Sequence, residues 1–171
     1  MIDESAVPTR RFSAPPRATV LIAMIIVLAD QISKHWAVSN LSAAPARHVV
    51  WTLQWNLTYN RGMAFSSGTG LGPVIGLIAI GIVVVLLACV GKVPGRLPRV
   101  AAGFVVGGAL GNVVDRLFRG DGWLRGAVVD FVDFQWFPIF NIADVAVNVG
   151  GGLFLLWSFV GQQPSARVRP S

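Results

Sequence analysis

The sequence predicts an all-α membrane protein with four transmembrane helices. Of its 171 residues, 54% are hydrophobic and only 13% are charged, whereas a soluble domain carries about a quarter charged residues. The apolar residues gather in four long runs, and a run of about 20 apolar residues spans a bilayer as a helix. The charged residues gather in the polar segments between these runs.

The four runs differ in how much polarity they contain. The predicted spans are residues 18–38, 71–91, 100–118 and 141–160. The first is interrupted late by Asp30 and Lys34, and the second has no charged residue. The third contains Gly103, Gly107 and Gly111 at intervals of four. Small residues at this spacing line one helix face and allow helix backbones to approach closely in lipid.

Two mixed segments, 39–70 and 119–140, connect the spans on one side of the membrane. Alternation of apolar and polar residues over 49–57 favours a strand over a helix. A second extended segment is expected at 126–134, where alternation places Asp130 on one side and Asp133 on the other. Aromatic residues in both segments are typical of a membrane–water interface.

The basic residues predict the orientation. Lys and Arg in short segments favour the cytoplasmic side of a membrane. Eight of the 14 cations lie in the N-terminal tail (1–17), the turn after the second span, and the C-terminal tail (161–171). With four spans both tails lie on one side, so we expect them in the cytoplasm and segments 39–70 and 119–140 outside.

Several classes of function are disfavoured. A single cysteine, Cys89, makes no internal disulfide and no cysteine-rich metal site, and His35 and His48 are not spaced as metal ligands. We therefore expect no metal site. The net charge of +6 flanks the apolar runs and forms no basic face with interleaved aromatics, so nucleic-acid binding is not expected.

Polar and ionisable residues near the outer ends of the spans are candidates for function, because such residues are costly in a membrane. Asp30 and Lys34 lie four apart on one face of the first helix and are expected to neutralise each other at the interface. Near the end of the third span, Asn112 and Arg116 share a face, and Asp115 points elsewhere.

The fourth span begins with another polar group. Asn141 follows Pro138 and is expected to cap the helix, which places Asp144 in the first turn, near the positive end of the helix dipole. Asp144 and Asn148 are expected to share an inward face. An acid in a first turn is ordinarily a stabilising feature of the helix and does not by itself indicate catalysis.

The combination of Asp130 with Asp144 is more informative. The two carboxylates fall at the same membrane depth, on elements joined by a short loop. Two acids placed close together share a proton, and an aspartic protease uses such a pair to activate water and protonate the scissile carbonyl. The sequence has no Gly-x-Ser-x-Gly elbow, His-Glu-x-x-His motif or phosphate loop for rival chemistries.

Five motifs in order resemble the lipoprotein signal peptidase (signal peptidase II) family of bacterial inner-membrane aspartic proteases. They are Asp30-x-x-x-Lys34, Asn60-x-Gly62-x-Ala64-Phe65, the segment 107–117 (GGALGNVVDRL), Val128-Val129-Asp130-Phe131 and Phe140-Asn141-Ile142-Ala143-Asp144.

The resemblance implies that 18–160 is one four-helix peptidase domain with Asp130 and Asp144 as the catalytic dyad. Asn60, Gly62, Asn112, Arg116 and Asn141 match the family's active-site or substrate-binding motifs. Asp30, Lys34 and Asp115 match positions important mainly for structure.

The resemblance also implies a small extracytoplasmic β-cradle and a short interfacial helix. The implied substrate is a prolipoprotein with a diacylglyceryl-modified cysteine, cut just before that cysteine by an enzyme embedded in the lipid bilayer. No metal, cofactor or nucleic acid is implied, and a monomer is expected. Two departures concern the loops: Met63 replaces the family's usual alanine, and Phe118–Ala127 is longer than usual.

Two other functions remain open at this point. A small proton-coupled transporter would relay protons through Asp30, Asp115 and Asp144, and it requires polar residues through the depth of several helices. A non-catalytic membrane scaffold would assemble through the glycines of the third span, and it would tolerate loss of the acids.

Overall fold

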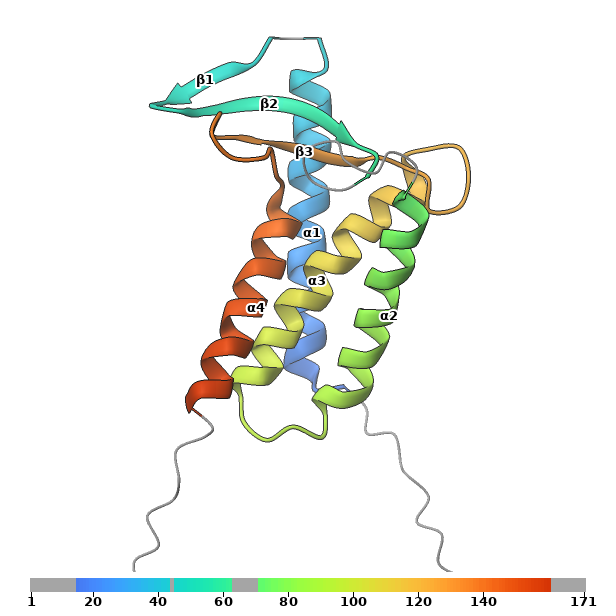
Figure 1. Cartoon of the computed structure of the whole chain (residues 1–171), viewed down its shortest axis with the longest axis vertical. Helices are drawn as coiled ribbons and strands as arrows, with labels where there is room; N and C mark the ends of the chain where they lie inside the picture. The colour runs from blue at the N-terminus through green and yellow to red at the C-terminus, as the bar shows by residue number, and fades with distance from the viewer. Residues whose placement is uncertain (1–14, 44, 63–70, 161–171) are drawn as a thin grey trace, which may run out of the picture.

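The structure is a computed structural model that describes residues 15–43, 45–62 and 71–160. Four long helices lie side by side in a bundle, with a small sheet across one end (Figure 1). The helices are α1 (Arg17–Leu41), α2 (Gly72–Val90), α3 (Leu97–Phe118) and α4 (Ile142–Val160). Each is long and apolar enough to cross a membrane, so the predicted all-α membrane class is confirmed.

The central helix is α3. Half of its most apolar 18-residue window is buried, against 17–22% in the other three helices. Gly107 and Gly108 explain how α3 approaches two neighbours at once. A Cβ on Gly107 would lie 2.9 Å from the carbonyl oxygen of Ala23 on α1, and one on Gly108 would overlap the carbonyl oxygen of Ala143 on α4. The spacing of Gly103, Gly107 and Gly111 predicts the close contact with α1, whereas Gly108, which lies against α4, is outside that pattern.

The sheet has three antiparallel strands in the order β1 (Arg47–Val50), β2 (Leu53–Asn60) and β3 (Val128–Asp133). The extended structure expected over 49–57 is present, but it is divided, because the chain reverses at Trp51 and forms the β1–β2 hairpin. Trp51 has a φ of 51°, a left-handed conformation that ends the first strand. Alternation alone gives no signal for this reversal.

The sheet is attached to the bundle by apolar and aromatic side chains. Val129 and Phe131 of β3 are buried against Ala37 and Leu41 of α1. Trp55 of β2 packs against this cluster, with its ring centroid 6.1 Å from that of Phe131. These contacts fix β3 over the ends of the helices, which positions Asp130 relative to α4.

The long segment after α3 is anchored by one side chain. Leu124 is fully buried, has a φ of 56°, and contacts Gly76 of α2. Segment 118–127 thus places a buried apolar side chain against α2. Met63 lies outside the described residues. Within those described, the four helices above account for all helical structure, so the short interfacial helix has no counterpart there.

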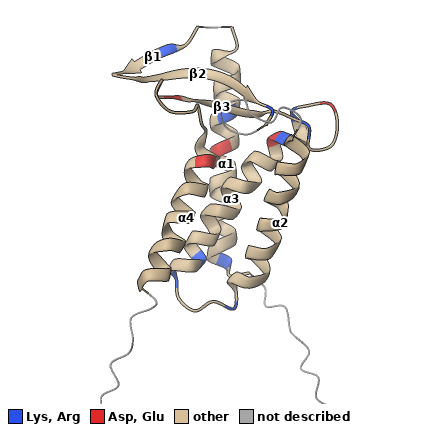
Figure 2. Cartoon of the chain, viewed as in Figure 1, with Lys and Arg blue, Asp and Glu red and all other residues tan. Residues whose placement is uncertain are grey.

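Charge is distributed unequally between the ends of the bundle (Figure 2). At the end away from the sheet, the charged residues that the structure describes are all basic: Arg17, Lys92, Arg96 and Arg99. Acidic and basic residues both occur at the sheet end. The polar groups that could perform chemistry are therefore concentrated at one end of the molecule.

Candidate active site

Asp144 is held at the start of α4 by a reciprocal cap. The backbone N–H of Asp144 donates to Asn141 Oδ1 at 3.0 Å, and the backbone N–H of Asn141 donates to Asp144 Oδ2 at 3.2 Å. The predicted Asn141 cap is thus present, and the acid three residues later completes a capping box. This arrangement satisfies two free helix N–H groups and fixes the carboxylate of Asp144 at the end of the bundle.

Asp130 lies on β3 and is 3% exposed. Asn141 Nδ2 donates to its Oδ1 at 2.6 Å, and Asn60 Nδ2 donates to its Oδ2 at 3.2 Å. The amide of Asn60 is oriented by the backbone N–H of Gly62, which donates to Asn60 Oδ1 at 3.0 Å. Residues from three predicted motifs therefore meet at this one carboxyl group.

Two asparagines connect the acids. Asn141 Nδ2, which donates to Asp130, also donates to Asn112 Oδ1 at 3.2 Å. Asn112 Nδ2 in turn donates to Asp144 Oδ1 at 2.8 Å. Asp130 and Asp144 thus belong to one hydrogen-bonded network that spans β3, α3 and α4.

The surroundings of Asp130 favour its protonated form. Burial, and then the negative charge of Asp144, raise the pKa of Asp130 to about 7, although hydrogen bonds from Asn141 and Asn60 act in the opposite direction. A carboxyl group with this pKa holds a proton for much of the time near neutral pH. The raised pKa of Asp130 is in the direction that the predicted proton-sharing pair requires.

Arg116 lies beside this network rather than within it. Its side chain is buried, and Nη1 donates to the backbone carbonyl of Asn112 at 3.3 Å. Its charge interacts with those of both Asp130 and Asp144. Arg116 thus supports the segment that carries Asn112 and places a positive charge near the acid pair.

Asp30, Lys34 and Asp115 form a buried ionic cluster, with all three side chains 0% exposed. Lys34 Nζ lies 2.8 Å from Asp30 Oδ2 and 2.8 Å from Asp115 Oδ2. The pair on α1 does neutralise its charges, as expected. The expected position at the interface is wrong, because α3 supplies a second carboxylate and covers the pair inside the bundle.

Gln31 is a member of this cluster that the sequence analysis did not single out. Its Nε2 donates to Asp30, to Asp115 and to the backbone carbonyl of Gly111, at 3.1–3.3 Å. The position of Gln31, a polar amide next to Asp30 in an otherwise apolar span, could have indicated that it belongs to this cluster.

Asp133 lies outside the candidate site, on the other side of β3, as alternation predicts. Burial opposes its ionisation, but hydrogen bonds from Asn56, Gln54 and the backbone of Gln135 outweigh this and lower its pKa below the usual value. Asp133 is therefore an ionised structural acid within the sheet.

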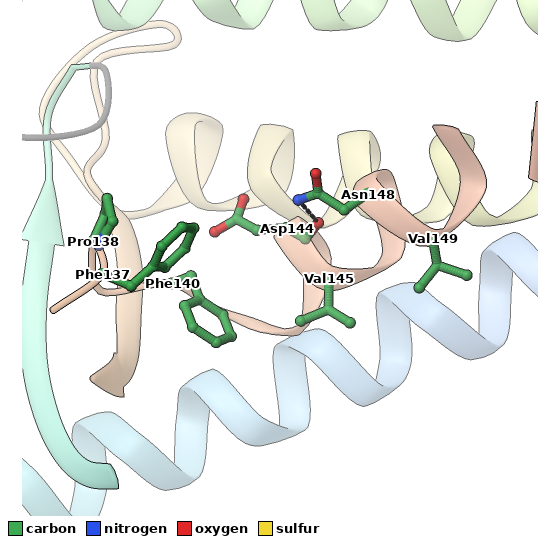
Figure 3. A pocket seen from close by; sticks show the side chains of 7 residues that line it. All are labelled: Phe137, Pro138, Phe140, Asp144, Val145, Asn148 and Val149. Atoms are coloured by element: carbon green, nitrogen blue, oxygen red, sulfur yellow. Dashed lines mark hydrogen bonds between the residues drawn. The ribbon is translucent and has the colours of Figure 1, made fainter. Parts of the chain in front are cut away.

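Asp144 borders an open cavity of about 440 Å³ (Figure 3). The other lining residues are Phe137, Pro138, Phe140, Val145, Asn148 and Val149. Asn148 shares this cavity wall with Asp144, as expected, but it is exposed, so the expectation that it faces inward is wrong. Its Nδ2 instead donates to the backbone carbonyl of Asp144 at 2.9 Å. The cavity is mostly apolar, with the carboxylate of Asp144 at its wall. It could accommodate an apolar part of a ligand while a polar group of that ligand lies beside Asp144.

The residues of the candidate site are carboxylates and amides. In the described ranges, no three His, Cys, Asp or Glu side chains are grouped as metal ligands. The arrangement offers two carboxyl groups, held by amide donors, that can accept and donate protons.

Comparison with known sequences gives consistent similarities. The family model for signal peptidase (SPase) II matches residues 22–160. The lipoprotein signal peptidase of Mycobacterium leprae (strain Br4923) is 36% identical over 159 residues, covering 92% of this chain and 77% of that protein. The lipoprotein signal peptidase of Mycobacterium avium (strain 104) is 39% identical over 160 residues, covering 91% and 87%.

Two solved structures have the same arrangement of the chain. Both are described as a bacterial membrane enzyme determined by the in meso method, one at 2.3 Å and one at 1.9 Å resolution. Their TM-scores are 0.75 and 0.73, with 27% sequence identity in each case. The matches cover 90% of this chain and 93% or 99% of the solved chain.

Proposed function

The chain belongs to the signal peptidase II family of membrane proteases, and we propose that it is an aspartic endopeptidase whose catalytic pair is Asp130 and Asp144. The observation that carries this proposal is the shared network of the two carboxyl groups, joined by Asn141 and Asn112. One acid is buried with a pKa of about 7, and the other borders an open cavity.

In the proposed mechanism the two acids begin in different protonation states. Asp130 carries a proton, and Asp144 is ionised and accepts a proton from a water molecule. The water oxygen attacks the scissile carbonyl carbon while Asp130 donates its proton to the carbonyl oxygen. The product of this step is a neutral tetrahedral diol.

Collapse of the diol completes the reaction. Asp144 gives its proton to the leaving nitrogen, the C–N bond breaks, and Asp130 recovers a proton from a hydroxyl group of the diol. Both acids return to their starting states, so no other proton carrier is required. The amides of Asn112, Asn141 and Asn60 keep the carboxyl groups oriented throughout.

We propose a prolipoprotein with a diacylglyceryl-modified cysteine as the substrate, cut just before that cysteine. Two observations support this substrate: the names of the relatives, and the position of Asp144 in the first turn of a helix long enough to span a membrane. A lipid anchor in the bilayer would bring the scissile bond to the depth of Asp144. The apolar wall of the adjacent cavity suits the side chains or acyl chains that flank such a bond.

The same proposal includes the setting of the enzyme. It would act as a monomer, without metal or cofactor, with both tails in the cytoplasm and the acid pair at the outer face of the bacterial membrane. The basic end of the bundle away from the sheet supports this orientation. A proton-coupled transporter is not favoured, because α2 carries no charged residue, and a scaffold is not favoured by the family relationship.

The substrate proposal is tested with purified protein in vesicles and one precursor in two forms, with and without the diacylglyceryl group. We expect cleavage of the lipidated form only, at the bond before the cysteine, unchanged by EDTA. Cleavage of both forms at equal rates would contradict the role of the lipid. Loss of activity in EDTA that zinc restores would contradict the metal-free mechanism.

A further inference from the structure

The buried lysine on α1 lies at the centre of three hydrogen bonds. Lys34 Nζ lies 2.8 Å from Asp30 Oδ2, 2.8 Å from Asp115 Oδ2 and 2.9 Å from Asn112 Oδ1. An ammonium group has three donors and no acceptor, so these three oxygens use its full capacity. The side chain is completely buried, so its ammonium group is held by these three oxygens in place of water.

Each partner of Lys34 holds a different part of the candidate site. Asp30 Oδ1 accepts the backbone N–H of Ala143, the residue before Asp144, at 3.0 Å. Asp115 Oδ2 accepts the backbone N–H of Val129, the residue before Asp130, at 3.1 Å. One ammonium group is thus connected, through one intervening carboxylate each, to both elements that carry the acids.

The third partner is connected to a catalytic side chain directly. Asn112 accepts from Lys34 through Oδ1, and it donates to Asp144 Oδ1 through Nδ2. Because an ammonium group only donates and a carboxylate only accepts, the two neighbours fix which end of the Asn112 amide faces Asp144. Asn141 Nδ2 also donates to Asn112 Oδ1, at 3.2 Å, so without Lys34 this oxygen keeps one donor and loses the shorter of its two hydrogen bonds.

From these contacts we propose that Lys34 is a positioning residue that sets the spacing and orientation of Asp130 and Asp144. Asp30 would carry its effect to the start of α4, and Asp115 would carry it to β3. Asn112 would carry it directly to the carboxylate of Asp144. This proposal rests on the proposed function, and it goes beyond a general role in holding α1 against α3. A purely structural lysine would affect the amount of folded enzyme but not the turnover of each folded molecule.

The test uses Lys34→Met, which keeps the length of the side chain and removes its donors. We expect kcat per folded enzyme to fall at least about 10-fold, because displacements of about 1 Å at an active site cost as much as 100-fold. KM should stay within about threefold, because no substrate contact is lost. Folded enzyme is quantified by size-exclusion chromatography and thermal unfolding in detergent.

A second variant keeps the test decisive if Lys34→Met leaves two unpaired acids and does not fold. The double variant Asp30→Asn with Lys34→Met removes one charge of each sign, and Asp115 keeps its partner Arg119 at 2.7 Å. The carbonyl oxygen of the amide introduced at position 30 can still accept from the backbone of Ala143, but Asn112 Oδ1 then accepts only from Asn141. We expect the same fall in kcat for this variant.

Thr19→Val is the matched structural control. Thr19 is also a fully buried polar residue of α1, and it donates to the backbone carbonyl of Arg99 on α3 at 3.0 Å, far from the acids in sequence. We expect Thr19→Val to lower the unfolding temperature and to leave kcat per folded enzyme unchanged.

A double variant that folds and turns over at the wild-type rate would overturn the proposal, as would a rise in KM with unchanged kcat. Asp144→Asn is assayed in parallel. If Asp144→Asn cleaves normally, the proposed aspartic mechanism fails. If it is inactive while the lysine variants retain kcat, only the inference about Lys34 fails.

Discussion

Asp130 and Asp144 are held by amide and backbone donors rather than by direct contact with cations. Asn60 and Asn141 donate to Asp130, and Asn112 and the backbone of Asn141 donate to Asp144. Amide donors orient a carboxyl group without forcing it to ionise as strongly as a neighbouring Lys or Arg would. Two nearby cations, Lys34 and Arg116, contact Asn112 instead. Burial and the charge of Asp144 therefore dominate the pKa of Asp130 and raise it to about 7.

The pKa of Asp130 predicts the pH dependence of the enzyme. The mechanism requires Asp130 in its protonated form, so kcat should fall as the pH rises through about 7. The hydrogen bond from Asn60 favours the ionised form, so Asn60→Leu should raise the pKa and move this fall in kcat to higher pH. Rates measured across the neutral range with lipidated precursor provide the test. A shift to lower pH in Asn60→Leu would contradict the assignment.

Individual site residues were predictable to different degrees. Asn141 and Asp144 follow from helix-capping rules, because both partners lie in one turn of the chain. The contact of Lys34 with Asn112 was not predictable from local patterns, because it depends on the register between α1 and α3. That register is set by side-chain packing over the length of both helices. Asn112 itself could be selected only through the motif resemblance.

At the scale of elements, α4 depends on close contact with α3. Asp144 occupies the right position only if the first turn of α4 lies against Gly108 and Gly111. An added Cβ would overlap the carbonyl oxygen of Ala143 at Gly108, and it would lie 2.6 Å from Asp30 Oδ2 at Gly111. These glycines therefore position the start of α4 as well as allowing the bundle to form.

Gly108→Ala is expected to destabilise the protein by about 1–3 kcal/mol and to reduce activity, because α4 must move away to avoid a clash with Ala143. Gly151→Ala is the matched control within α4, since a Cβ there meets nothing within 4 Å. The control should be neutral or stabilising by up to about 1 kcal/mol through helix propensity. Chemical unfolding in detergent measures both changes. Equal stability of the two variants would contradict the proposed role of Gly108.

Helical elements were easier to predict than strands. The four apolar runs lie within a few residues of the observed helices, because hydropathy depends only on local composition. The β1–β2 hairpin was missed, since Trp51 adopts a positive φ without a glycine or asparagine to signal a turn. The buried position of Lys34 was also missed, because its second acid, Asp115, lies far along the chain on α3.

At the scale of the whole molecule, all of the proposed chemistry lies at one end of the bundle, next to the sheet. The charged residues described at the opposite end are all basic, which predicts its cytoplasmic location. A protease in this orientation would meet substrates at the outer surface of the membrane, while the rest of its four helices lies in lipid.

Cysteine labelling tests this orientation. In a Cys89→Ala background, Asp121→Cys places a thiol at the sheet end, and Pro94→Cys places one at the opposite end; both positions are exposed. A membrane-impermeant maleimide added to intact spheroplasts should label the thiol at position 121 and spare the one at position 94. Disrupted membranes provide the control, in which both should react. The reverse pattern in spheroplasts would contradict the proposed topology.

The catalytic pair is tested most directly by three aspartate variants assayed with lipidated precursor in vesicles. Asp130→Asn and Asp144→Asn should each lower kcat by at least about 100-fold, because each removes one partner of the acid–base pair. Asp133→Asn is the control, since Asp133 is a buried acid of the same strand that faces away from the pair. It should retain kcat within about threefold, because it takes no part in proton transfer. Normal turnover in folded Asp130→Asn or Asp144→Asn would contradict the assignment of the dyad.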